Sequence, residues 1–332
     1  MPTQRDIAEK LGVSVSLVSR VLSDKAESIG VSPDTIKRVR ATADRMGYVP
    51  NAQARILKGA PAMTLGVLVY DFEDPFFGGV IGALQAQAGE SGYSLVLAGF
   101  HRRQVAQRDL EPLLKHRIDG LVIVGSGALG DWTEPFRRRD IPMVRIGTGA
   151  LPADVSEVGV DEEAGMRMIV EHLAGLGHQR IGYIGGAGTY QPQRLLAFRQ
   201  ALEDGRQTLE DPAYAPGDGH VSEAGYAATR SLLERGGDVP TALVAASDVV
   251  ALGVLRALNE AGHRVPDDVS VAGFDDLPLA AMASPPLTTI HQPFEAFAED
   301  AVALLTGSKR AEQPLLLAPR LVVRASSGRV FI

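Results

Sequence analysis

Apolar positions near the start of the chain recur at helical spacing in two short runs. In the first run Ile7, Ala8 and Leu11 share one face of a helix. In the second run one face carries Leu17, Val18, Val21 and Leu22. The pattern predicts two amphipathic helices joined by a turn.

Residues at the ends of these runs favour the same boundaries. Thr3 and Asp6 have the spacing of a capping box, with aspartate as its carboxylate. Gly12 suits the left-handed conformation that ends a helix, and Ser14 is a good cap for the next one. We expect a helix-turn-helix unit.

The second helix leaves Val15, Ser16, Ser19 and Arg20 on its outward face. A helix in the major groove contacts base edges chiefly with its N-terminal residues, so we expect Val15 and Ser16 to contact the bases. Arg20 would contact guanine or a phosphate. The alternative is a small helical bundle with a solvated polar face. The candidate DNA contacts of this unit are Thr3, Ser14, Val15, Ser16, Ser19 and Arg20.

A third helix is predicted to begin at Ser32 and Pro33 and to end at Gly47. Its buried stripe would consist of Ile36, Val39, Ala43 and Met46. Residues 52–58 can form a short further helix that has too little apolar surface to be stable alone. We therefore expect this segment to be a linker.

From Leu65 onward, short apolar runs alternate with helical stretches. The first series of strand-like runs is LGVLVY, YSLVLAGF, GLVIVG and PMVRIG, and the second is IGYIGG, TALVAAS, VSVAGF and LTTIHQ. Such runs are typical of parallel strands buried on both faces. They predict two doubly wound α/β lobes, with a ligand site beyond the carboxyl ends of the strands.

Charge separates the start of the chain from the rest. Residues 1–58 contain ten Lys or Arg against six Asp or Glu, whereas the remainder contains 23 against 34. A basic head on an acidic body restricts contact with nucleic acid to the head. The chain has no cysteine, no apolar signal core in MPTQRDIAEK and no apolar run of the roughly 18 residues that span a bilayer. We expect a cytoplasmic protein with no disulfide or membrane segment.

The segments DIAEKLGVSVSLVSRVL, SPDTIKRVRATADRMGYVPN and AQARILKG together resemble the lactose-repressor (LacI/GalR) family of bacterial transcription regulators. The resemblance extends over nearly the whole chain. It implies a DNA-binding head at 1–49, a hinge helix and linker at 50–61, and a two-lobed body at 62–332 like a type I periplasmic sugar-binding protein. It also implies a homodimer on a palindromic double-stranded operator, controlled by a sugar or sugar-derived effector in the cleft.

The resemblance gives roles to three linker residues, Asn51, Ala54 and Leu57. The hinge helix would fold on DNA and insert Leu57 between bases of the minor groove, where the kink requires other contacts to offset its cost. Ala54 is small enough to let paired hinge helices approach. The alternative for Leu57 is a linker leucine that rests on the body.

Several residues near strand ends are candidates for the effector site. Asp71, Phe76 and Phe77 follow the first strand, and either phenylalanine would stack on a sugar ring or instead pack in the core. By resemblance Arg194 grips the ligand, although a lone arginine is more often a solvated charge. Asp248 would accept ligand hydroxyls, cap its helix, or do both. The resemblance adds Tyr190, Phe274 and Gln292.

One position departs from the family pattern. Arg145 and Gly147 stand where the lactose repressor has a hydroxyl-binding aspartate. An arginine at this place puts a simple β-galactoside in doubt and leaves an acidic sugar or another effector open.

Enzymatic sites are not indicated. The seven histidines form no HExxH pair, no serine lies in a GxSxG motif, and GGAG at 185–188 lacks the third glycine of a dinucleotide site. We expect no metal and no cofactor. The sequence favours a repressor, and the alternative is a regulator of this fold with a non-sugar effector, a corepressor or no effector.

Overall fold

The computed structural model describes most of the chain in two compact units, Met1–Ala62 and Met63–Ile332. The described residues are 2–23, 30–48, 60–100, 103, 105–125, 130–149, 152, 154–186, 192–205, 208–209, 213–215, 221–236 and 239–330.

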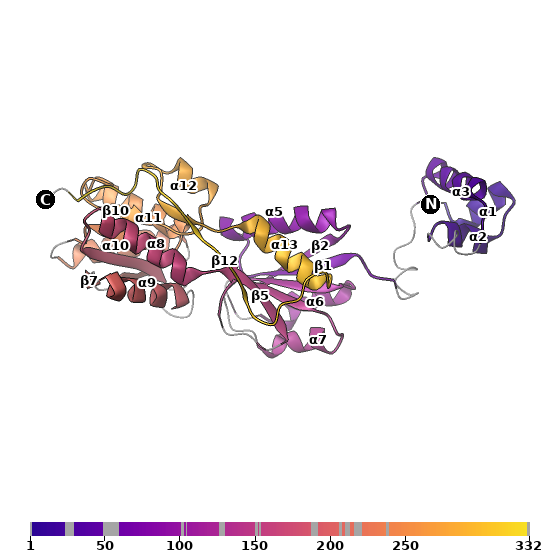
Figure 1. The fold of residues 1–332 in the computed structure, drawn as a ribbon, viewed down its shortest axis with the longest axis horizontal. Coiled ribbons are helices and arrows are strands. Elements are labelled where there is room, and N and C mark those ends of the chain that lie inside the picture. Colours follow the sequence, from indigo (N-terminus) through magenta and orange to yellow (C-terminus); the bar gives the residue numbers. More distant parts are fainter. Residues whose placement is uncertain are drawn as a thin grey trace. The chain divides into compact units, whose positions relative to one another are not determined.

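The described part of the head contains the helices α1 (Gln4–Leu11), α2 (Val15–Val21) and α3 (Pro33–Met46) (Figure 1). The predicted capping box is present, since Asp6 N–H donates to Thr3 Oγ1 and Thr3 N–H donates to Asp6 Oδ2. Gly12 ends α1 with a φ of 67°. Ser14 caps α2 by accepting from Leu17 N–H at 3.2 Å. The predicted helix-turn-helix is confirmed.

The predicted apolar faces form the core of the head. This core consists of Ile7, Ala8, Val18, Val21, Ile36, Val39 and Ala43. Asn51, Ala54 and Leu57, with the short helix expected over 52–58, lie outside the described residues.

The first lobe of the body contains a six-stranded parallel sheet in the order β12-β5-β4-β3-β1-β2. Its strands are β1 (Thr64–Val69), β2 (Ser94–Gly99), β3 (Gly120–Val124), β4 (Met143–Ile146), β5 (Val155–Val160) and β12 (Leu315–Leu317). The helical elements are α5 (Pro75–Glu90), α6 (Gln107–Lys115), η2 (Asp131–Thr133), α7 (Glu134–Arg137) and α13 (Phe294–Leu305). Helices α5 and α13 cover one face of the sheet, and α6 and α7 lie on the other (Figure 1).

The second lobe has a parallel sheet in the order β10-β9-β6-β7, with β8 also paired to β6. Its strands are β6 (Arg180–Gly186), β7 (Thr208–Leu209), β8 (Ala213–Ala215), β9 (Ala242–Ala245) and β10 (Ser270–Ala272). Its helices are α8 (Glu162–Gly175), α9 (Pro192–Gly205), α10 (Ser222–Glu234), α11 (Asp248–Glu260) and α12 (Pro278–Met282).

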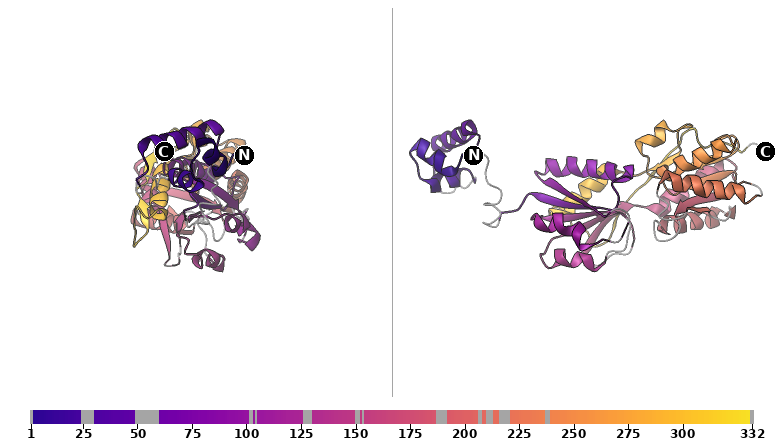
Figure 2. Two further views of the ribbon diagram at one scale, coloured as in Figure 1. Left: turned by 90° about the vertical axis from the view of Figure 1, so that its right-hand side faces the viewer. Right: turned by 180° about the vertical axis from the view of Figure 1, so that it is seen from behind.

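The chain passes between the lobes after β5, before α13 and after β12. The right-hand view of Figure 2 shows the two lobes and the connections between them as seen from behind. The two-lobed parallel α/β architecture is therefore as predicted. One predicted strand pairs differently, because LTTIHQ was expected to join the second parallel series. Instead β11 (Thr289–His291) pairs antiparallel with β13 (Arg320–Val322), the segment that returns from the first lobe.

Among the helices of the described residues, none combines the length and apolarity needed to cross a bilayer.

Candidate functional site

The outward side of α2 is one candidate site. Val15 is 44% exposed, Ser16 and Arg20 are exposed, and Ser19 is half-buried. The buried side chains Val18 and Val21 hold the opposite face of α2 in the head core. The exposed side of the helix thus carries one apolar, one polar and one basic side chain, those of Val15, Ser16 and Arg20, and begins at a capped N-terminus.

Thr3 and Ser14 have a structural role at the two helix starts. Both are exposed, and both side chains accept a backbone N–H of the first turn. The hydrogen bonds that Thr3 gives to Asp6, from its backbone first and then from its hydroxyl, lower the pKa of the Asp6 carboxyl. These caps fix the orientation of α1 and α2.

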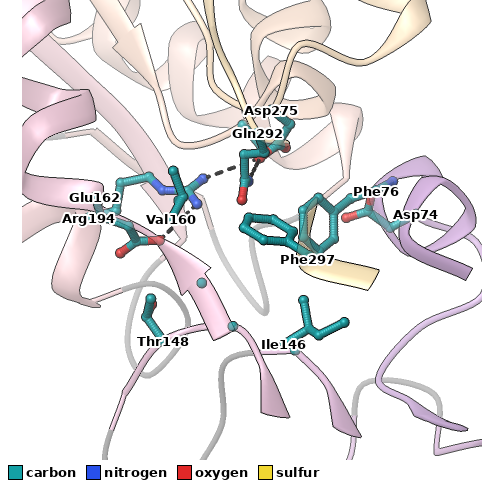
Figure 3. Close-up of a pocket in the computed structure, with 14 residues that line it drawn as sticks. Asp74, Phe76, Ile146, Thr148, Val160, Glu162, Arg194, Asp275, Gln292 and Phe297 are labelled. Atoms are coloured by element: carbon teal, nitrogen blue, oxygen red, sulfur yellow. Dashed lines mark hydrogen bonds and ion pairs between the residues drawn. The ribbon is translucent and has the colours of Figure 1, made fainter. Parts of the chain in front are cut away.

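The second candidate site is a cavity between the two lobes of the body that is partly open to solvent. Figure 3 shows the polar groups of the second lobe facing aromatic rings of the first. The lining residues are Asp74, Phe76, Gly125, Ile146, Gly147, Thr148, Gly159, Val160, Glu162, Arg194, Ser247, Asp275, Gln292 and Phe297.

Arg194 is the central cation of this lining. It extends from α9, is 3% exposed, and its Nη2 donates to Glu162 Oε1 at 2.9 Å. Its Nη1 donates to the Ala246 carbonyl at 2.5 Å and lies 3.8 Å from Asp275 Oδ1. Burial opposes the charged form, but the carboxylates of Glu162 and Asp275 raise the pKa of the guanidinium above its ordinary value. Arg194 remains a cation whose charge is already balanced within the protein.

Asp275 lines the cavity and was not among the predicted site residues. It lies in the GFDD turn after β10 with a φ of 122°, an unusual conformation for a residue other than glycine. Gln292 Nε2 donates to its Oδ1 at 2.6 Å. Burial raises the pKa of the Asp275 carboxyl well above its ordinary value, and nearby Arg194 counteracts part of this effect. The sequence signal that could have identified Asp275 is a carboxylate directly after a strand.

Phe274, the residue that was predicted in this motif, is fully buried. Its ring lies beneath the guanidinium of Arg194, with 3.8 Å between Cζ and the ring centroid. Phe274 therefore supports Arg194 and does not line the cavity.

Asp248 is buried beside the cavity, and its neighbour Ser247 lines it. The suggestion that Asp248 caps its helix is wrong, because Ser247 is the cap residue and accepts from Val250 N–H. The Asp248 carboxylate instead accepts from Thr289 Oγ1 at 2.6 Å and from Leu277 N–H at 2.8 Å. Burial raises the pKa of Asp248 to about 7. The contact with Leu277 holds the residue that directly follows the GFDD turn.

The two predicted phenylalanines have different surroundings. Phe76 lines the cavity, whereas Phe77 is 1% exposed and belongs to the core of the first lobe. Phe77 therefore packs in the core, which was the alternative to stacking on a sugar ring. The ring of Phe76 makes edge contacts with Phe77 and Phe294, with centroids 5.3 and 5.4 Å apart. Phe297 of α13 also lines the cavity and was not predicted.

Arg145 and Asp71 are buried and are absent from the described lining. Arg145 forms an ion pair with Glu157 on the adjacent strand and donates to the Gly149 carbonyl at 2.5 Å. Burial raises the pKa of the Glu157 carboxyl, and Arg145 opposes that shift. Asp71 accepts from Glu73 N–H at 3.0 Å. The remaining candidate, Tyr190, lies outside the described residues.

Comparisons with known proteins match both parts of the chain. Residues 3–51 match the model of bacterial regulatory proteins of the lacI family, and residues 170–327 match a periplasmic binding protein-like domain. The HTH-type transcriptional repressor PurR of Photobacterium profundum is 33% identical over 334 residues, which are 98% of each chain. PurR of Serratia proteamaculans is 33% identical over 98% of this chain and 97% of its own.

Solved structures agree with these matches. The lac repressor dimer bound to operator and the anti-inducer ONPF has a TM-score of 0.85 at 29% identity, covering 98% of this chain and 99% of its own. The complex of the transcriptional regulator CelR with cellobiose has a TM-score of 0.70 at 30% identity, covering 98% of this chain and 100% of its own.

Proposed function

This chain belongs to the lacI family of bacterial regulatory proteins and is a DNA-binding transcriptional repressor, and we propose that it binds a two-fold symmetric operator as a homodimer under the control of a small effector. Like its relatives, which are transcriptional repressors, it is a regulator and not an enzyme. The structural neighbour bound to operator is itself a dimer, which supports the proposed assembly.

The outward face of α2 would enter the major groove. Val15 and Ser16 lie in its first turn, where a recognition helix contacts base edges, and Ser19 and Arg20 follow one turn later. Thr3 and Ser14 would hold the helix starts against the phosphates. On the family resemblance alone we assign the minor-groove insertion to Leu57, a DNA contact to Asn51, and the close approach of the paired hinge helices on DNA to Ala54.

The body offers a surface on which a second copy would pack. Strand β2 is an edge of the first sheet and carries Leu97 at 42% exposure, and Met282 at the end of α12 in the second lobe is 85% exposed. Edge strands and exposed apolar side chains are stabilised by being covered. These features support dimerisation through the body.

The observation that best supports an effector is the arrangement of the cleft. Arg194, Asp275 and Gln292 of the second lobe face the ring of Phe76 from the first lobe across one cavity (Figure 3). Several hydrogen-bonding groups opposite an aromatic ring suit a polyhydroxyl ring, which has polar edges and apolar faces. The cellobiose complex of CelR is consistent with a sugar.

A ligand in this cleft contacts both lobes and would favour one relative arrangement of them. The effect on DNA affinity then equals the difference in the ligand's affinity for the two states. Either release from the operator or tighter binding is compatible with this linkage.

Operator binding is tested with the full-length protein and a palindromic operator identified by selection. Ser16→Ala and Arg20→Ala should weaken binding to that operator more than to random DNA of the same length. Arg38→Ala, on the exposed side of α3, is the matched control and should alter both affinities equally. Equal losses of affinity for both DNAs in Ser16→Ala and Arg20→Ala would contradict sequence-specific base contacts by α2.

The effector is tested by thermal shift against neutral mono- and disaccharides. A ligand at about a hundred times its Kd stabilises the native state by roughly 2.7 kcal/mol. Asp275→Asn should abolish the shift, and Asp267→Asn on the exposed surface should retain it. A shift that survives in Asp275→Asn would contradict binding in this cleft.

A further inference from the structure

Two of the three connections between the lobes meet at one short antiparallel ladder. The chain leaves β11 at His291, three positions before α13 begins at Phe294 in the first lobe. It returns from the first lobe after Leu317 of β12 and begins β13 at Arg320, three positions later. Strands β11 and β13 pair with each other. A change in the arrangement of the lobes therefore has to alter the backbone dihedral angles beside this ladder.

The GFDD turn, which brings Asp275 into the cleft lining, runs beside β11. Asp275 N–H donates to the Ile290 carbonyl at 2.8 Å, and Gln292 N–H donates to the Asp275 carbonyl at 3.3 Å. Asp276 follows with a φ of 56°, so two successive residues other than glycine have a positive φ. Such conformations persist only where the surrounding structure holds them. Contacts with neighbouring segments therefore decide the shape of this turn.

The carboxylate of Asp276 joins the turn to both strands of the ladder. Its Oδ2 accepts from His291 Nδ1 at 2.9 Å, and its Oδ1 accepts from Arg324 Nη2 at 2.6 Å. Arg324 lies two residues after the end of β13 and also donates to the Leu287 carbonyl at 2.8 Å. The side chain of Asp276 is only 13% exposed, so solvent screens these contacts weakly. We refer to Asp276, His291 and Arg324 as the Asp276 clamp.

His291 is the member of the Asp276 clamp whose charge depends on pH near neutrality. Histidine is the side chain that ordinarily changes charge between pH 5 and 8, and the imidazole of His291 is partly accessible to water. Protonation converts its hydrogen bond with Asp276 into an ion pair. Because charge-assisted hydrogen bonds are roughly twice as strong as neutral ones, a lower pH should tighten the clamp.

The other charged groups around His291 do not replace Asp276 as its partner. Arg320 is the residue opposite His291 on β13, but it is exposed, so solvent screens its repulsion. The adjacent Ile290 packs against Gly165 of α8, and side chains alternate along a strand, so the imidazole points away from α8. The charged groups of the described residues near this position are Asp276, Arg320, Arg324 and, behind the turn, Asp248.

We propose that Asp276 is a positioning residue for allosteric control: its carboxylate holds the lobes in one arrangement through β11 and β13, and protonation of His291 strengthens this hold and changes the affinity for the operator. Asp276 is absent from the described cavity lining, so it acts through its neighbours. The proposal rests on the proposed control of DNA binding by the lobes and adds an element that transmits it. A ligand that contacts Asp275 would act on the same turn, so pH and effector would share one element.

The test measures the affinity of the full-length protein for its selected operator from pH 8 to pH 6, at constant ionic strength, by fluorescence anisotropy. Residues 1–58 contain no histidine, and all seven histidines lie in the body, so their titration affects DNA binding only through the body. The ratio of the His291→Gln Kd to the wild-type Kd should change about threefold or more over this range. His116→Gln makes the same change at an exposed position of the first lobe, and its ratio should stay constant.

Asp248 also titrates in this range, because burial raises its pKa to about 7. It is retained in His291→Gln and in the wild type, so its own contribution largely cancels from the ratio of their Kd values. A residue that only stabilised the fold would lower the melting temperature when replaced but would leave this ratio independent of pH.

Asp276→Asn removes the charge and keeps a side chain that tolerates a positive φ. Its operator Kd should follow the pH profile of His291→Gln within about twofold, and the double variant should match either single variant, because both changes remove one contact. Asp140→Asn is the matched control, since Asp140 is an exposed aspartate of the first lobe with a φ of 53°. It should keep the wild-type profile. If Asp276→Asn does not fold, His291→Gln, at a partly exposed side chain, carries the test.

Amide hydrogen exchange separates the clamp from its effect on DNA. Loss of the Asp276 carboxylate should accelerate exchange at the amides of Asp275 and Gln292 by about threefold or more, and Asp140→Asn should not. Unchanged exchange and a constant Kd ratio would refute the clamp and leave effector control intact. Faster exchange with a constant Kd ratio would show that the clamp exists without influencing the DNA, which also counts against control through the lobes.

Two further outcomes would overturn the assignment of residues. A double variant whose effects simply add would place the pH dependence on another group than the contact between His291 and Asp276. An equal pH-dependent change in His116→Gln would attribute it to histidine charge in general. Failure of every saccharide in the thermal-shift test would count against a sugar effector but not against the clamp, because the pH measurement requires no ligand.

Discussion

The guanidinium of Arg194 rests on the ring of Phe274, with 3.8 Å from Cζ to the ring centroid. Phe274 in turn packs against Gly165 of α8, where an added Cβ would lie 2.9 Å from ring atom Cε2. The cleft arginine is thus held from behind by a buried aromatic side chain. The position of Arg194 depends on the core of the second lobe as well as on its ion pairs.

Replacement of Phe274 by leucine should destabilise the body. The change keeps an apolar side chain but removes the ring beneath a buried cation, so we expect a loss of about 1–2 kcal/mol in the free energy of unfolding by urea. Phe72→Leu, at a side chain that is 45% exposed, should cause less than half of that loss. Similar losses for both variants would show that the stacking adds nothing.

The Arg145–Glu157 pair should behave as a buried structural ion pair. Arg145→Met leaves the Glu157 carboxylate buried without its cation, and we expect about 3–5 kcal/mol of destabilisation. The double variant Arg145→Met with Glu157→Leu should recover most of this loss, because no unpaired charge remains. A double-mutant cycle from urea unfolding measures the coupling, and strict additivity would contradict it.

Asp248 should make stability depend on pH. Its folded pKa of about 7 lies above the ordinary value of 3.8, so the folded state binds the proton more tightly. The contribution of this proton to the free energy of unfolding is complete below the pKa of Asp248 in the unfolded state. It is lost as pH rises through about 7, by at most about 1.4 kcal/mol per pH unit.

Asp248→Asn removes this titration. The difference in unfolding free energy between wild type and variant should therefore decrease from pH 4 to pH 8, whereas groups present in both proteins largely cancel. Urea unfolding across that range measures it. Parallel curves for the two proteins would exclude a raised pKa at Asp248.

The contact between α10 and α11 depends on a glycine. A Cβ at Gly253 would lie 1.9 Å from the Ser222 carbonyl oxygen, so Gly253→Ala must separate the helices. We expect a loss of about 1–3 kcal/mol or more in thermal or urea unfolding. Gly82→Ala, at an exposed position of α5, meets no atom within 4 Å and should instead stabilise by up to about 1 kcal/mol. A neutral Gly253→Ala would contradict the close packing.

The sequence by itself determined the elements that are specified locally. The head helices begin at Thr3, Ser14 and Ser32 because each side chain caps its own first turn, which is visible within four residues. The buried strands were recognisable because parallel strands covered on both faces are continuously apolar. Family motifs added Arg194 and Gln292, which both line the cleft.

Only the tertiary structure decided the features that depend on distant partners. Strand β5 was not predicted because Glu157 interrupts its apolar pattern, and its charge is balanced by Arg145 from β4. The return of α13 and β12 to the first lobe, and the pairing of β11 with β13, follow from packing between segments far apart in sequence. For the same reason Glu162 and Asp275 were missed. Their importance arises from sharing Arg194, and a contact among three separate segments exists only after the lobe has folded.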